Sequence, residues 1–105
     1  MNINFRKEIL NMTDSPIKVE GSEDNFTIGT AAVNALLFSY EDESKISGED
    51  KLKRYNLAKN IQVSMNEKEE LETESKDIVF LKTYIGKFGY SPLIYGRCDE
   101  ILEGK

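Results

Sequence analysis

Histidine and tryptophan are absent from this sequence, and cysteine occurs once, at Cys98. The lack of histidine excludes Ser–His–Asp triads and Cys–His pairs, and it removes the commonest general acid–base group. A single thiol cannot close a disulfide within the chain, nor can it form a zinc site of the usual Cys/His type. Because Cys98 shares a helical spacing with Ile94, Ile101 and Leu102, we expect a packed thiol rather than a nucleophile.

Long apolar runs are also missing. No stretch approaches the roughly 18 consecutive apolar residues that a membrane-spanning helix needs, and no apolar segment follows the first basic pair as it would in a secretory signal. We therefore expect no membrane association and a cytoplasmic location. The chain has 14 Lys and Arg residues against 19 Asp and Glu residues, a net charge of -5, which argues against a dedicated binder of nucleic-acid phosphates.

The composition that remains is typical of one globular domain. The 105 residues are 39% apolar and 31% charged, and a chain of this size forms a single core. We therefore predict one domain over residues 1–105, with a hairpin in residues 1–20 and a helical part in residues 27–103. The hairpin prediction rests on the turn residues Thr13-Asp14-Ser15-Pro16, which separate apolar segments at about 3–11 and 16–20.

Helical spacing of apolar residues recurs in four segments, at about 28–40, 48–62, 74–86 and 92–103. Residues with capping side chains precede them, namely Thr27, Ser47, Thr73 or Ser75, and Ser91. Gly86 or Gly89 is expected to end the third helix. The predicted fold class is α+β, mainly α, with the N-terminal β-hairpin packed on a bundle of about four helices.

Acidic side chains gather after the second predicted helix, at Glu67, Glu69, Glu70, Glu72 and Glu74. The low apolar content of this segment favours a solvated acidic surface, because little apolar cover is available to raise a carboxyl pKa for acid–base catalysis. Two alternatives stay open. The oxygens could form a Mg²⁺ or Ca²⁺ site, or the charges could imitate a phosphate backbone.

Two further segments contain aromatic residues that point to binding. Lys51-Leu52-Lys53-Arg54-Tyr55 has the ingredients of a phosphate or RNA contact, but its spacing favours the exposed side of the second helix. The turn before the fourth helix crowds four large side chains, Phe88, Tyr90, Leu93 and Tyr95. Because aromatic anchors supply binding energy at interfaces, we predict a partner surface there. The alternative is that these residues close the last helix onto the first.

Core and cap positions spread over nearly the whole chain carry a resemblance. They are Ile17-Lys18, Thr27-Ile28-Gly29, Asn34-Ala35-Leu36-Leu37, Gly48-Glu49-Asp50-Lys51-Leu52-Lys53-Arg54-Tyr55-Asn56-Leu57-Ala58, Asp77-Ile78, Ile85-Gly86-Lys87 and Ser91-Pro92-Leu93 before Gly96. Together they look like a family of small bacteriophage or prophage proteins. The resemblance implies a phage origin, and it transfers no activity to particular residues.

The lack of any catalytic constellation predicts a protein that is not an enzyme and needs no cofactor. The expected function is to bind and modulate a host or phage protein, without direct contact to nucleic acid. One alternative is a virion component or tail-assembly chaperone, in which self-association replaces host targeting. The other is a small metal-dependent enzyme that uses the acidic segment.

Overall fold

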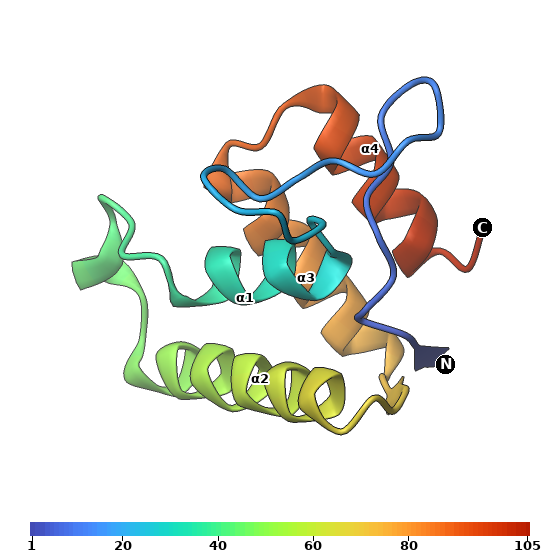
Figure 1. Ribbon diagram of the computed structural model, residues 1–105. Helices are drawn as coiled ribbons and strands as arrows, with labels where there is room; N and C mark the ends of the chain where they lie inside the picture. Colours follow the sequence, from blue (N-terminus) through green and yellow to red (C-terminus); the bar gives the residue numbers. More distant parts are fainter.

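Helix α1 (Ile28–Leu37) lies at the centre of the molecule (Figure 1). The computed structural model describes all residues from 1 to 105, and α1 packs against each of the other helices. The Thr27 hydroxyl accepts a hydrogen bond from the Thr30 N–H at 3.1 Å, which confirms the predicted cap. The predicted end at residue 40 is wrong. The chain becomes extended at Phe38, where a side chain from the next helix binds the last carbonyls of α1.

Helix α2 (Gly48–Asn66) runs along one side of α1 and follows the short 3₁₀ turn η1 (Glu43–Lys45). The Ser47 hydroxyl accepts a hydrogen bond from the Asp50 N–H at 3.1 Å, so this predicted cap is also confirmed. The helix continues four residues beyond the predicted end at residue 62. Ser64 is buried and Met65 packs against the core, so tertiary contacts stabilise a last turn that has little apolar periodicity.

Helices α3 (Ser75–Phe88) and α4 (Pro92–Leu102) complete the bundle. Gly89 ends α3 in a left-handed conformation, at φ 90°, and is one of the two glycines predicted for this role. The Ser91 hydroxyl accepts a hydrogen bond from the N–H of Ile94, as expected for a cap before Pro92.

The predicted side-chain cap of α3 is wrong. The N-cap residue is Glu74, and its side chain makes no capping hydrogen bond. Thr73, one of the two predicted caps, is buried, and its hydroxyl donates to the carbonyl of Leu71. Its N–H donates to the carbonyl of Met1 at 2.8 Å. Thr73 therefore extends the pairing between the N-terminus and β2 and does not cap α3.

The regular sheet is small and joins distant parts of the chain. Strand β1 (Asn2–Ile3) pairs antiparallel with β2 (Leu71–Glu72), a partner that the sequence analysis did not predict. Of the predicted N-terminal hairpin, the turn at residues 11–15 is present. It is flanked by a single antiparallel bridge, between Leu10 and Pro16. Two further bridges continue the pairing to residue 27. The α+β, mainly α class with four helices is thus confirmed, with far less strand than the hairpin prediction implied.

One hydrophobic core of 17 buried residues joins the N-terminal segment to all four helices. Phe5 and Ile9 contribute to it from the N-terminal segment, and both are fully buried. The closest approach is at Gly29, whose N–H donates to the Phe5 carbonyl at 2.8 Å. A Cβ at this position would overlap the sulfur of Met65 and lie 2.7 Å from the Phe5 carbonyl oxygen. Only glycine therefore fits where α1, α2 and the N-terminal segment meet.

Candidate functional site

The predicted partner surface before α4 is partly taken up by internal packing. Phe88, Tyr90, Leu93 and Tyr95 are all half-buried. The rings of Phe88 and Tyr90 lie 4.6 Å apart, and the Tyr90 hydroxyl donates to the carbonyl of Ala31 at 3.1 Å. Burial raises the pKa of Tyr90 to about 12. These contacts close the turn onto α1, as in the alternative that the sequence left open.

The predicted acidic surface lies around β2 and the turns beside it. Glu67, Glu69, Glu70, Glu72 and Glu74 are all exposed. Glu72 pairs with the amino group of Met1 at 2.9 Å, and Glu74 pairs with Lys76 at 3.4 Å. No group of three or more Asp, Glu or Cys side chains is arranged to hold a metal ion together.

Cys98 is buried inside the core, where the sequence predicted a packed thiol. Burial alone raises the pKa of this thiol to about 12. A thiol with so high a pKa is protonated at neutral pH and lacks the thiolate that acts as a nucleophile. The environment of Cys98 is therefore that of a structural residue.

Arg54 is a charged residue within the core, where only 4% of it is exposed. Its guanidinium donates to the carbonyls of Leu36 at 2.9 Å and Phe38 at 2.6 Å, and it pairs with the Glu43 carboxylate at 2.5 Å. A helix leaves its last carbonyls without internal partners, and a cation there also complements the helix dipole. The prediction that Arg54 lies on the exposed side of α2 is therefore wrong, because the end of α1 recruits it.

Aromatic rings enclose the same guanidinium. It lies 4.7 Å from the Tyr84 ring centroid and 5.3 Å from that of Tyr40. Burial raises the pKa of Tyr40 to about 12, although the charge of Arg54 opposes the shift. Hydrogen bonds from the Tyr40 backbone N–H and then from Arg54 lower the pKa of Glu43. Both shifts move away from neutral pH, so this cluster has the character of a structural support and not of an acid–base pair.

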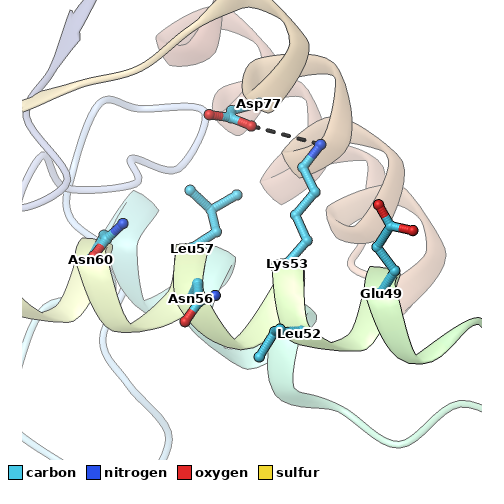
Figure 2. Close-up of a pocket in the computed structure, with 7 residues that line it drawn as sticks. All are labelled: Glu49, Leu52, Lys53, Asn56, Leu57, Asn60 and Asp77. Atoms are coloured by element: carbon cyan, nitrogen blue, oxygen red, sulfur yellow. Dashed lines mark ion pairs between the residues drawn. The ribbon is translucent and has the colours of Figure 1, made fainter.

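A polar groove of about 360 Å³ lies between α2 and the start of α3. Figure 2 shows Lys53 extending from α2 toward Asp77, with an N–O separation of 3.8 Å. The ammonium of Lys53 also lies 4.4 Å from the centre of the Phe80 ring. The side chains of Asn56 and Asn60 line the groove one helical turn apart. The groove is a shallow polar surface, and Lys53 already engages Asp77 within it.

An apolar groove of about 320 Å³ lies between α1 and α2. Five of its seven lining residues are hydrophobic, namely Val33, Leu37, Tyr55, Ala58 and Val63. Leu37, Tyr55 and Val63 are 57%, 55% and 43% exposed. Large apolar side chains this accessible, gathered on one face, mark a surface suited to binding.

A second hollow of about 280 Å³ continues the first and shares Leu37 and Tyr55 with it. Phe38, which is 49% exposed, stands in this hollow. Its ring makes edge contacts with the rings of Tyr40 and Phe88, at centroid distances of 5.0 Å and 5.1 Å. These two contacts fix the orientation of the Phe38 ring. The two hollows together are termed the α1–α2 groove, and its defining residues are Val33, Leu37, Phe38, Lys51, Tyr55, Lys59 and Val63.

Sequence reasoning missed this groove, although a signal for it exists. Leu36, Leu37 and Phe38 are three large apolar residues in succession, and the end of one helix cannot direct all three into the core. In α2, Tyr55 and Val63 fall outside the stripe formed by Leu57 and Ile61. Apolar residues left over from two helices thus mark a shared exposed face, but only the packing of α1 against α2 brings them together.

Comparison with known proteins found no matching family model, no matching curated protein and no matching solved structure. No helix combines the length and apolar character that crossing a bilayer requires. The candidate site therefore stands on its own geometry, which is an exposed apolar groove with two lysines and a tyrosine along one wall.

Proposed function

We propose that this protein is a non-enzymatic binding domain that acts on another protein through the α1–α2 groove. The observation that carries the proposal is the exposure of Leu37, Phe38, Tyr55 and Val63 along one continuous groove. Keeping large apolar side chains in water offers no folding benefit, whereas their burial against a partner contributes roughly 25 cal/mol per Å².

Two features support a binding role over an accidental exposure. Tyrosine is enriched among the residues that dominate binding energy, because it offers a large rigid surface with a polar end. Phe38 is already oriented by two aromatic neighbours, so less conformational entropy is lost when a partner covers it. A preorganised aromatic side chain at one end and Tyr55 in the middle give the groove fixed points of contact.

The biological setting of the proposal comes from the resemblance to small bacteriophage proteins. On this proposal the partner is a host or phage protein met in the cytoplasm of an infected bacterium. Modulation of that partner follows if the groove covers a surface that the partner needs for its own interactions. This setting stays a prediction and does not affect the assignment of the binding face.

Site-specific crosslinking tests the proposal. A photoreactive p-benzoylphenylalanine replaces Tyr55 in one variant and Val79 in another, and both are expressed in the bacterial host. Val79 is 62% exposed on α3 and does not line the groove, so it is a matched control. We expect a discrete crosslinked protein from position 55, lost when Leu37→Gln is added, and none from position 79. Equal crosslinking from both positions, or none from position 55, would contradict the proposal.

A further inference from the structure

Two lysines flank Tyr55 along one wall of the α1–α2 groove. Lys51 and Lys59 each lie four residues from Tyr55, so the three side chains share one face of α2. Lys59 lines the first hollow and Lys51 the second, and both are exposed. The groove therefore has a positive charge on each side of its central aromatic residue.

These lysines differ from the other cations of the same helix. Lys53 pairs with Asp77 and Arg54 pairs with Glu43, whereas Lys51 and Lys59 form no ion pair. Glu43 is the only carboxylate that lines the groove, and Arg54 already engages it. In a chain with a net charge of -5, the groove is thus a local positive surface with two unpaired ammonium groups.

The dimensions of the groove favour a helical occupant. At a rise of about 1.5 Å per residue, Lys51 and Lys59 lie about 12 Å apart along α2. Lys51 and Val63 lie about 18 Å apart. That length corresponds to about three turns of a partner helix. The walls come from α1, α2 and the segment that joins them, with no open strand edge, so they suit the apolar stripe of an amphipathic helix and not an added strand.

We propose, on the basis of the function proposed above, that the groove binds an acidic amphipathic helix of a partner protein. The apolar stripe of that helix covers Leu37, Tyr55 and Val63. Carboxylates beside the stripe, about eight residues apart, pair with Lys51 and Lys59. The apolar contacts supply most of the affinity, and the charges select acidic partners and fix the register.

Selection from a random peptide library tests this proposal with the full chain as the target. Peptides of about 16 residues are long enough for about four helical turns. The enriched peptide is then titrated by fluorescence anisotropy against the native chain and three double variants. K51E/K59E reverses the lysines of the groove, and L37Q/Y55Q removes its apolar walls. K76E/K105E makes the same charge change at exposed lysines outside the groove. Circular dichroism checks that each variant is folded.

The proposal predicts that enriched peptides are amphipathic and acidic. K51E/K59E should weaken their binding by about tenfold or more, while K76E/K105E changes it by less than about twofold. Binding to the native chain should weaken as salt is added, because exposed ion pairs are screened. A peptide in which lysines replace the acidic residues should recover affinity for K51E/K59E.

Three other results would overturn the proposal, and they separate it from the binding function itself. Peptides that lack acidic residues, and that lose binding in L37Q/Y55Q but not in K51E/K59E, would leave the binding face intact and refute the acidic partner. Self-association of the native chain that L37Q/Y55Q abolishes would make a second copy the occupant. If no peptide binds the native chain better than L37Q/Y55Q, the acidic partner and the binding face both fall.

Discussion

Arg54 and Tyr55 are neighbours in the sequence, yet they belong to two contrasting regions of the molecule. The region around Arg54 is closed, because the guanidinium is buried, donates to two backbone carbonyls and one carboxylate, and lies against the Tyr84 ring. The region around Tyr55 is open, since the ring is 55% exposed and the lysines four residues away on each side form no ion pair. Two successive residues of α2 thus face in different directions, one into a buried structural cluster and the other into an exposed apolar groove.

The difference between the two regions shows that residue type alone does not separate buried structural residues from exposed ones. Both regions consist of aromatic rings and cations, and both involve the end of α1. In the closed region, the orphan carbonyls of Leu36 and Phe38 attract the cation inward. The ammonium groups of Lys51 and Lys59, beside Tyr55, make no hydrogen bond or ion pair within the chain and stay in solvent. The carbonyls at the end of α1 therefore account for the burial of Arg54.

The largest expected loss of stability comes from a substitution in the closed region around Arg54. Arg54→Met leaves the carbonyls of Leu36 and Phe38 without the guanidinium donor, and the carboxylate of Glu43 keeps only the Tyr40 N–H. Hydrogen bonds to a charged group contribute about 1.5–3 kcal/mol each, so the loss of the two bonds to backbone carbonyls should cost about 3–5 kcal/mol in the free energy of unfolding. Denaturant unfolding measures the change, and Arg54→Lys should recover part of it. Lys59→Met, an exposed cation on the same helix, should change stability by less than about 0.5 kcal/mol.

A second substitution tests the packing of the helix that both regions share. Gly29→Ala places a Cβ against the Phe5 carbonyl and the Met65 sulfur, so we expect a loss of about 3 kcal/mol in the free energy of unfolding. Gly96→Ala is the matched control in α4, where nothing lies within 4 Å of the added Cβ. It should stabilise the protein by about 0.5–1 kcal/mol. Equal effects of the two substitutions would contradict the close approach at Gly29.

A smaller effect on stability is expected in the turn between α3 and α4, where Phe88 contacts Phe38 and Tyr90 contacts Phe88. Tyr90→Phe removes the hydrogen bond to the Ala31 carbonyl and leaves the ring in place. The expected loss is about 1 kcal/mol in the free energy of unfolding. Tyr95→Phe removes a hydroxyl that makes no hydrogen bond, and it should change stability by less than about 0.5 kcal/mol. A Tyr90→Phe protein as stable as the native chain would show that the turn is held by packing alone.

The pH dependence of stability gives a further test of the closed region. Because the pKa of Glu43 in the folded protein lies below its ordinary value of 4.5, the ionised carboxylate stabilises the fold. This contribution is present above about pH 4.5 and is lost as the pH falls through the lower folded pKa. Glu43→Gln should therefore lower the Tm at neutral pH, and the difference from the native chain should shrink below about pH 4.5. A difference that grows on acidification would contradict the assigned role.

The smallest change in stability is expected from a double substitution in the open region around Tyr55. L37Q/Y55Q replaces two exposed apolar residues of the α1–α2 groove by a good helix former, so the free energy of unfolding should change by less than about 0.5 kcal/mol. The same variant should lose peptide binding. A loss of stability as large as that of Arg54→Met would show that the groove belongs to the structural core.

Local signals in the sequence determined the four helices, three of their caps and the fold class. Thr27, Ser47 and Ser91 cap the helices as predicted, because a cap depends on residues only two or three positions away. The buried position of Cys98 also followed from helical spacing. The N-terminal turn was likewise visible in its own residues, although its strands were predicted too long.

Only the tertiary structure decided the pairing of β1 with β2, the inward turn of Arg54 and the existence of the α1–α2 groove. Each depends on groups far apart in the chain: a strand partner about 70 residues away, carbonyls at the end of another helix, and apolar residues on two helices. Periodicity describes the faces of one element, but it contains no information on which two elements meet. The candidate binding site of this protein arises where two such faces come together.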